Sequence, residues 1–189
     1  MSAPCPKRGW TTKDGRPFVV REAEVADAGQ IIAHTRAILT EPWWMITEPD
    51  EFRLTVDQEE GWILGFREQP HGLLLVADVG AAEARQIVGV LGFNTQARRR
   101  LQHRGRIGLS VQIPYRGLGI GQALLQTLLD WATVEPGLER IELSVFAHNT
   151  RALDLYRKLG FIVEARLPRT VKLADGTYYD DVMMVKWVK

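Results

Sequence analysis

The chain has very little cysteine and no long apolar run. Cys5 is the only cysteine among 189 residues, which excludes an intramolecular disulfide and indicates a reducing compartment. No stretch approaches the roughly 20 consecutive apolar residues that a membrane-spanning helix needs. Residues 1–8 contain no apolar core of a secretory signal. We therefore expect a cytoplasmic protein with no membrane partner.

An excess of charge of one sign is also absent, because the net charge is only +1. Such a chain creates no global field that would recruit nucleic acid. The densest basic patch, at 98–106, lacks interleaved aromatic residues, and we interpret it as a solvated hairpin. The four histidines show neither i, i+4 pairing nor a cysteine partner pattern, which predicts no metal site. Neither nucleic acid nor a metal ion is expected as a partner.

The remaining composition is that of an ordinary globular domain, with 46% hydrophobic and 25% charged residues. Hydrophobic periodicity predicts strands at 18–21, 73–79, 87–93, 106–111, 140–146, 161–163, 166–171 and 178–187. It predicts helices at 27–39, within 41–67, after 121 and after 149. This order predicts an α/β or α+β fold, a sheet covered by helices. We interpret residues 1–16 as a flexible N-terminal tail, in which Cys5 has no fixed neighbours, and 17–189 as one domain.

A glycine-rich run from Arg116 to Gly121 leads directly into a helical pattern. Gly117, Gly119 and Gly121 leave room for a ligand to touch the main chain. Such a turn at a helix N-terminus presents unpaired N–H groups and the positive end of the helix dipole to an anion, typically a phosphate. Arg116 adds a positive charge at its mouth. The alternative is an ordinary glycine-rich turn that caps a helix.

The run does not fit the two common nucleotide motifs. A P-loop needs Gly-Lys-Ser/Thr, but Gln122 and Ala123 follow Gly121. The dinucleotide fingerprint G-x-G-x-x-G needs glycine at 122 or 124, where the chain has Gln122 and Leu124. A nucleotide-binding protein is therefore the less favoured alternative.

A second motif begins at Asn149, a favourable N-cap for the helix that follows a predicted strand. Ala152, Leu155, Tyr156 and Leu159 share one face of this helix, and the following glycine ends it. Two strings, R-x-x-G-x-G from Arg116 and N-x-x-A-x-x-L-Y-x-K-x-G-F from Asn149, resemble the two conserved segments of the Gcn5-related N-acetyltransferases. The resemblance covers residues 105–187 well and the first hundred residues only in general layout.

The resemblance is strongest to a bacterial branch that contains enzymes similar to polyamine and ribosomal-protein acetyltransferases. It implies a single domain with a mixed, mostly antiparallel central sheet flanked by helices. It also implies an N-acetyltransferase that uses acetyl-CoA, without a metal, to acetylate a primary amine of a small molecule or peptide by direct attack. A homodimer is left open. A non-catalytic acyl-CoA-binding or regulatory module on the same fold is the alternative from another class.

Carried onto this sequence, the resemblance implies CoA-binding residues in a strand, the glycine loop and two helices: Leu109, Ser110, Val111, Arg116, Gly117, Leu118, Gly119, Ile120, Gly121, Gln122, Asn149, Arg151 and Tyr156. The N–H of Val111 is implied to stabilise the oxyanion, and the Tyr156 phenol to protonate the thiolate. The alternatives are that Tyr156 is only core and Asn149 only a cap. The general base stays open among Glu142, His103, Asp180 and Asp181.

Residues 40–68 correspond in order to the helical segment that shapes the acceptor site in the family. Seven acidic residues and one basic residue lie between 41 and 60, interleaved with aromatic residues. Anionic groups beside aromatic faces attract ammonium groups. We hypothesise that this segment borders a cleft for a cationic primary amine, with Trp43 or Trp44 facing the substrate. Neutralising Glu48, Asp50 and Glu51 together is then expected to weaken binding of the amine. The alternative is an ordinary solvated helix surface.

Overall fold

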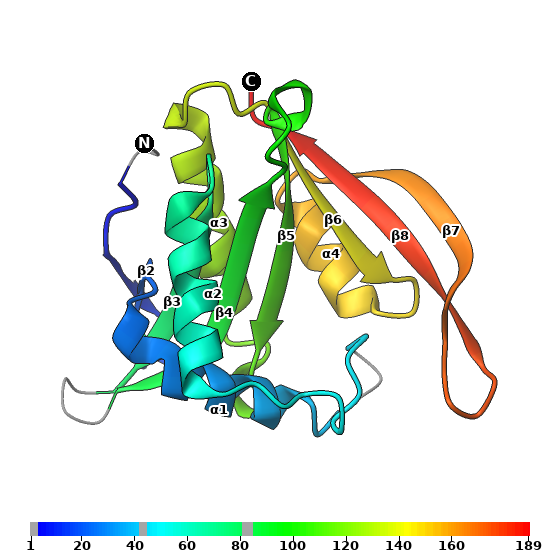
Figure 1. The fold of residues 1–189 in the computed structure, drawn as a ribbon, viewed down its shortest axis with the longest axis horizontal. Helices are drawn as coiled ribbons and strands as arrows, with labels where there is room; N and C mark the ends of the chain where they lie inside the picture. Colours follow the sequence, from blue (N-terminus) through cyan, green and yellow to red (C-terminus); the bar gives the residue numbers. More distant parts are fainter. Residues whose placement is uncertain (1–3, 42–44, 81–84) are drawn as a thin grey trace.

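A mixed sheet runs through the computed structural model, which describes residues 4–41, 45–80 and 85–189 (Figure 1). Across these residues its strands are β1 (Arg8–Thr11), β2 (Pro17–Glu22), β3 (Leu73–Val79), β4 (Gln86–Thr95), β5 (Arg104–Val111), β6 (Arg140–Phe146), β7 (Ile162–Lys172) and β8 (Tyr178–Trp187). Their order in the sheet is β1-β2-β3-β4-β5-β6-β8-β7. Only β5 and β6 pair in parallel, which confirms the prediction of a mixed, mostly antiparallel sheet.

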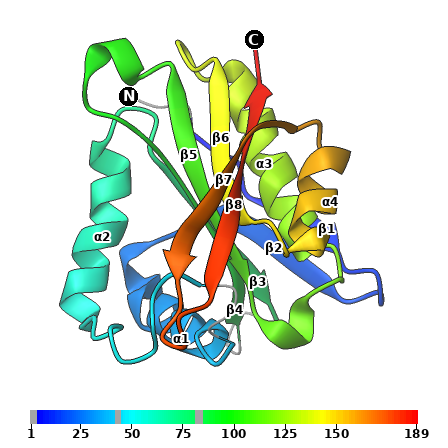
Figure 2. The same cartoon turned by 90° about the vertical axis from the view of Figure 1, so that its right-hand side faces the viewer.

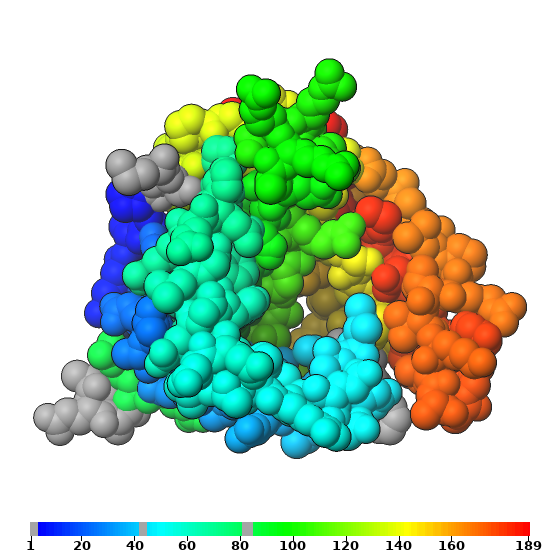
Figure 3. Space-filling model, viewed as in Figure 1, coloured from blue at the N-terminus to red at the C-terminus, as the bar shows by residue number. Residues whose placement is uncertain are grey.

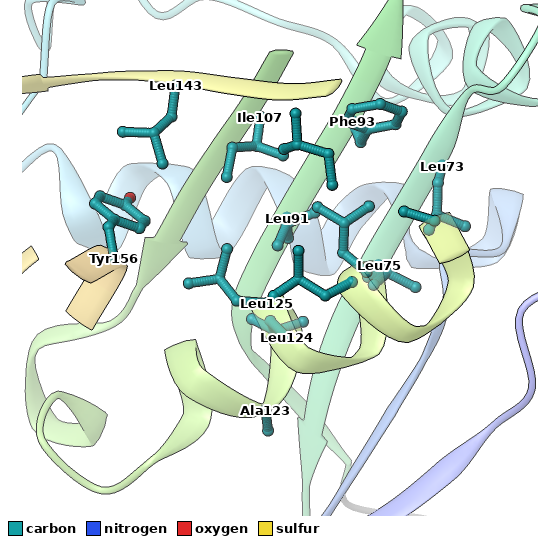
Figure 4. Packing of buried hydrophobic residues seen from close by; sticks show 14 of the residues in the cluster. Leu73, Leu75, Leu91, Phe93, Ile107, Ala123, Leu124, Leu125, Leu143 and Tyr156 are labelled. Carbon is teal, nitrogen blue, oxygen red and sulfur yellow. The ribbon is translucent and has the colours of Figure 1, made fainter. Parts of the chain in front are cut away.

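Helices cover both faces of the sheet (Figures 1 and 2). They are α1 (Ala28–Ile38), α2 (Val56–Glu68), α3 (Ile120–Val134) and α4 (Thr150–Lys158). α1 and α2 pack on one face, where Ile31, Ile63 and Phe66 meet Leu74, Val76, Ile87 and Val90. α3 and α4 pack on the opposite face over the larger core (Figure 4). Within the described residues, no helix is long and apolar enough to cross a membrane.

Local signals explain where the helices begin. The Thr55 hydroxyl accepts a hydrogen bond from the Gln58 N–H, and the Gln58 side chain accepts one from the Thr55 N–H, so a capping box starts α2. The Asn149 side chain accepts from the Ala152 N–H, which makes it the N-cap of α4. α3 instead follows Gly119, whose φ of 99° lies in the left-handed region that glycine favours.

The N-terminal segment is more ordered than predicted. Residues 8–11 form β1 and pair antiparallel with β2, so the prediction of a flexible tail over 1–16 is wrong there. Cys5 is buried, and its N–H donates to Glu22 Oε1 at 2.8 Å. Burial raises the pKa of its thiol to about 11, so Cys5 is a neutral core side chain with fixed neighbours. The short, polar sequence of β1 carries little periodic signal, and its pairing with β2 is what orders it.

The parallel pairing of β5 with β6 is very short, and this positions the site. Only Arg104, Gly105 and Arg106 pair with β6, although β5 continues to Val111 and β6 to Phe146. Beyond these three residues the two strands separate. A side-chain bond also joins the paired parts of the two strands, from Arg104 of β5 to Glu142 of β6. Buried Glu142 accepts from Arg104 at 3.2 Å and from Arg140 at 2.8 Å.

Gly105 lies at the base of this separation, under the ring of Phe93. A Cβ built at Gly105 would lie 2.3 Å from Phe93 Cζ and 2.9 Å from the Asn94 carbonyl oxygen. The Phe93 ring cannot easily give way, because its other side packs edge-on against Trp131 with centroids 5.9 Å apart. Because Gly105 has no side chain, the Phe93 ring can pack directly against the backbone at the base of the strand pair.

We expect Gly105→Ala to destabilise the fold by about 1–3 kcal/mol, because it overpacks a fixed core. Thermal unfolding should show a correspondingly lower Tm. Gly108→Ala, in the same strand, is the matched control, since a Cβ there would meet nothing within 4 Å. Equal melting temperatures for the two variants would contradict this account of Gly105.

Candidate active site

A cavity of about 1030 Å³ opens where β5 and β6 separate. Its lining includes Leu109 and Val111 from β5, Ser144 and Val145 from β6, and side chains from all four helices or their caps. In Figure 3 the surface is hollowed between the α1–α2 side and the β7–β8 hairpin, drawn cyan and orange-red. The cavity thus reaches both faces of the sheet through the gap between the two strands.

The glycine loop forms one side of this cavity. Gly117 and Gly119 have φ values of 83° and 99°, and both line the cavity together with Gly121 and Gln122. No side chain caps the N-terminus of α3, so its first N–H groups are open to a ligand. Of the predicted loop residues, Leu118 and Ile120 do not line the cavity. Leu118 accepts from the Lys13 N–H through its carbonyl, and Ile120 packs in the core.

Three cations stand around the loop. Arg151 lies against Gly117, since a Cβ built there would be 2.6 Å from Arg151 Nη2. Lys13, which the sequence did not single out, lines the same part of the cavity. Arg116 Nε donates to the Val111 carbonyl oxygen at 3.0 Å, and its Nη1 pairs with Glu41. The charge that Arg116 adds at the mouth is therefore partly neutralised by Glu41.

The edge of β5 that faces the gap carries unpaired backbone groups. Gln112 N–H donates to the Val88 carbonyl of β4 at 2.9 Å. Because alternate residues of a strand direct their N–H and C=O groups to opposite edges, Leu109 and Val111 direct theirs away from β4. The bond from Arg116 to the Val111 carbonyl comes from that side and agrees with this direction. The Val111 N–H thus points into the gap where β6 has separated.

Tyr156 lines the cavity from α4, opposite this edge. Tyr156 is only 7% exposed, and its ring packs edge-on against Phe161 with centroids 5.8 Å apart. Figure 4 shows it beside Leu143 at the border of the main core. Burial raises the pKa of its phenol to about 12, so the hydroxyl stays protonated at neutral pH. Asn149, two helical turns before it, both caps α4 and lines the cavity.

The four residues considered as a general base differ in whether they line the cavity. Glu142 is bound to two arginines at the base of the strand pair. Asp180 accepts from Arg166 and from the Arg169 N–H on the hairpin, and these bonds hold its pKa below the usual range. His103 and Asp180 do not line the cavity. Asp181 does, and it accepts a hydrogen bond from the Ser144 hydroxyl at 2.8 Å.

The other side of the cavity, which we name the α1–α2 wall, comes from α1, α2 and the segment between them. It consists of Ile31, Thr35, Ile38, Met45, Ile46, Thr47, Phe52, Leu54, Gln58, Glu59, Trp62 and Phe66. Among the described lining residues, its only charge is Glu59, which is 4% exposed. Burial raises the pKa of this carboxyl group.

The acidic residues chosen from the sequence do not form this wall. Glu48, Asp50 and Glu51 are exposed and absent from the cavity lining, and Glu51 accepts the Glu48 N–H. The role expected for these three carboxylates is therefore wrong, although other residues of the same segment, among them Phe52 and Glu59, do line the cavity. Trp43 and Trp44 lie outside the described residues. The aromatic residue that the structure does place on the wall is Trp62, edge-on to Phe66 with centroids 4.8 Å apart.

The predicted strand residue Ser110 faces α1. Its hydroxyl lies 2.8 Å from His34 Nε2, and burial lowers the pKa of this histidine to about 4. A neutral His34 therefore fixes Ser110 from behind. Ser110 and Gly108 face α1 and α2, whereas Leu109 and Val111 pack toward the larger core. One strand thus contributes alternate residues to the two sides of the cavity.

The family model for the acetyltransferase (GNAT) family matches residues 10–161. This match spans most of the chain, and the protein belongs to that family. The L-amino acid N-acetyltransferase AaaT of Escherichia coli is 30% identical over 53% of this chain and 61% of its own length. The N-alpha-acetyltransferase of Sulfurisphaera tokodaii is 28% identical over 79% of this chain and 83% of its own length. The chain thus matches less than two thirds of the length of the first of these relatives.

Solved structures share the fold. A GNAT-family acetyltransferase from Streptococcus pneumoniae superposes with a TM-score of 0.83 at 26% identity, over 90% of this chain and 99% of its own. A phosphinothricin acetyltransferase from Sinorhizobium meliloti, described in complex with acetyl-CoA, gives a TM-score of 0.76 at 18% identity, over 94% and 89%. The predicted family and fold are therefore confirmed.

Two site residues were missed for different reasons. Lys13 reaches the glycine loop only because its N–H bonds to Leu118, a contact without a sequence signal. For Glu59 the sequence does contain a signal, because Glu59 lies at helical spacing with Trp62, Ile63 and Phe66 on the apolar stripe of α2. A carboxylate on such a stripe is expected to be buried, whereas acidic residues on the other faces of a helix are exposed to solvent. Among the described residues, no group of histidine, cysteine and acidic side chains is arranged to hold a metal ion.

We expect Gly119→Val to weaken CoA binding by roughly 100-fold or more, because a branched side chain would displace phosphate oxygens from charge-assisted hydrogen bonds. Calorimetric titration with CoA measures this. Gly137→Val is the matched control, since Gly137 also has a positive φ and open space around it but lies in the turn before β6. Both variants carry similar backbone strain. If they bind CoA equally well, the glycine loop is only a turn.

Proposed function

We propose that the protein is an acetyl-CoA-dependent N-acetyltransferase that acts on a primary amine by direct attack. The observation that carries this proposal is the single cavity between the separated strands, which the glycine loop, the Val111 edge and Tyr156 all line. Relatives whose names specify N-acetyltransferases support the reaction type. Their acceptors differ, so the acceptor does not follow from the relationship.

The residues around the loop fit the diphosphate of CoA. The positive end of α3, the backbone of Gly117 to Gly121 and the cations Lys13 and Arg151 together form an anion site. Arg116 becomes a third cation of this site when its guanidinium group leaves Glu41 and binds a phosphate oxygen. The edge of Leu109 and Val111, whose N–H groups face the gap, suits the amide groups of a pantetheine arm. When bound, acetyl-CoA supplies the activated acetyl thioester.

The Val111 N–H serves as the oxyanion donor in this proposal. It belongs to a strand fixed by β4 on its other edge, so its direction is set before a ligand binds. A preorganised donor aimed at developing negative charge is often worth about 10²–10³ in rate.

Tyr156 holds the proton that the departing sulfur receives. With a pKa of about 12, its phenol is fully protonated at neutral pH. Complete transfer to a free thiolate with a pKa of about 8.5 would be uphill. The phenol therefore donates a hydrogen bond as charge develops on sulfur. As the C–S bond breaks, the phenol gives its proton to the sulfur, and the phenolate regains one from the amine nitrogen, which is by then bonded to the acetyl carbon. CoA leaves as the thiol and Tyr156 ends as a phenol.

Transfer of a radiolabelled acetyl group from acetyl-CoA to an amine panel tests the proposal. The panel should contain polyamines, amino acids, aminoglycosides and peptide N-termini. Product formation supports the enzyme. Tight CoA binding with no transfer to any amine supports the non-catalytic acyl-CoA-binding alternative.

We expect Tyr156→Phe to lower kcat by roughly 10²–10⁴-fold with little change in CoA affinity, because only the proton donor is lost. Tyr178→Phe, on the exposed hairpin, should retain the activity of the native enzyme. The kcat of the native enzyme should not fall between pH 7 and 10 through ionisation of Tyr156, since its raised pKa lies above that range. An unchanged kcat in Tyr156→Phe, measured where chemistry limits the rate, removes Tyr156 from the mechanism.

A further inference from the structure

The α1–α2 wall combines an apolar surface with one buried carboxylate. Ile31, Thr35 and Ile38 project from α1 at helical spacing, and Glu59, Trp62 and Phe66 do so from α2. The carboxylate of Glu59 has no hydrogen-bond or ion-pair partner among the described residues, although the residue is 96% buried. Burial of an unpaired carboxylate is costly. A partner that arrives with a ligand removes that cost.

The floor beside this wall is open. Gly92 and Gly108 face each other across β4 and β5, and both line the cavity. The Phe66 ring fills the space above Gly92, since a Cβ there would lie 2.9 Å from it. Above Gly108 a Cβ would meet nothing within 4 Å. An open path therefore runs over bare backbone from the α1–α2 wall toward the gap between β5 and β6.

The charges of the cavity are divided between its sides. Its described cations, Lys13, Arg116 and Arg151, all belong to the glycine loop and its surroundings. No lysine or arginine lines the α1–α2 wall within the described part of the chain. A carboxylate on the acceptor would lack a counter-ion there and would be repelled by Glu59. A second ammonium group would be placed among apolar side chains.

From this arrangement we propose that the acceptor is a primary amine on an apolar body without a neighbouring carboxylate, and that its ammonium group pairs with Glu59. The inference rests on the proposed acetyltransferase function and names the substrate class of its acceptor side. Two sources share this chemistry: a free arylalkyl or alkyl monoamine, and the N-terminus of a peptide that begins with an apolar residue. Glu59 is thus the residue that determines specificity.

Matched acceptors test the proposal through CoA release. 2-Phenylethylamine represents the free monoamine, and the peptide Phe-Ala-Ala represents the apolar N-terminus. L-Phenylalanine adds only a carboxylate to the first, and spermidine replaces the apolar body with further cations. We expect kcat/KM for one of the first two to exceed that for L-phenylalanine and spermidine by about tenfold or more, given the cost of burying an uncompensated charge. A preference for either of the latter overturns the proposal.

Glu59→Gln separates a role in recognition from a role in folding. It should lower kcat/KM for the preferred amine by about tenfold to hundredfold, as expected for loss of a charge-assisted hydrogen bond. Glu60→Gln, its neighbour on α2 outside the cavity lining, should stay within about twofold of the native enzyme. The Tm of Glu59→Gln should not fall, because the carboxylate that it removes has no partner among the described residues. Equal kinetics for the two variants overturn the role of Glu59.

Binding provides a readout that does not need turnover. In the presence of saturating CoA, calorimetric titration with 2-phenylethylamine and with Phe-Ala-Ala should show tenfold weaker binding of the preferred ligand to Glu59→Gln. 2-Phenylethanol, which lacks the ammonium group, should bind both proteins alike. If no amine is acetylated but Glu59-dependent binding persists, the proposed function fails and the ligand class stands. If other amines are acetylated and these two neither bind nor react, the ligand class fails and the function stands.

Discussion

The pairing of β5 with β6 ends at Arg106 and Glu142, and the geometry of the site depends on where it ends. A side-chain bond from Arg104 of β5 to the buried Glu142 of β6 joins the two strands at this point, Arg140 of β6 binds the same carboxylate, and the ring of Phe93 lies over Gly105 nearby. Beyond it, β6 is bound only to β8, so the facing edge of β5 keeps its N–H groups unpaired. Unpaired backbone groups in a protein interior are costly unless a ligand or water satisfies them. The separation thus creates a binding edge out of ordinary sheet hydrogen-bonding groups.

The same strand lines both sides of the cavity because of its twofold periodicity. Leu109 and Val111 pack toward the glycine-loop side, while Gly108 and Ser110 face α1 and α2. His34 has its pKa lowered to about 4 and stays neutral, so it fixes Ser110 without adding a charge to the acceptor side. Among the described lining residues, the lysine and arginines lie on the side where phosphate is expected, and Glu59 is the charged residue of the α1–α2 wall. This separation of charge suits an anionic donor and a cationic acceptor that meet at one point.

The sequence predicted the parts of the site that local signals determine. β3 and β6 were found at their observed bounds because strict apolar patterning marks buried strands, and Gly117 and Gly119 were found because positive φ angles require glycine. β1 was missed because its order comes from pairing with β2. Glu59 was counted among seven acidic residues of one segment, and nothing local separates a buried carboxylate from the exposed Glu48 and Asp50 except its place on an apolar stripe. Side-chain partners such as Arg116 with Glu41 lie too far apart in the chain for spacing to reveal them.

Glu59 and Glu142 show how differently two buried carboxylates act in one fold. Glu142 is bound by two arginines, so its charge is compensated within the protein and it stabilises the strand pair. Glu59 has no such partner among the described residues, and burial raises its pKa. In the proposed recognition, the ammonium group of the acceptor supplies the counter-ion that Glu59 lacks among the described residues. Glu142 thus has a structural position at the base of the strand separation, and we assign Glu59 to recognition of the acceptor at its open end.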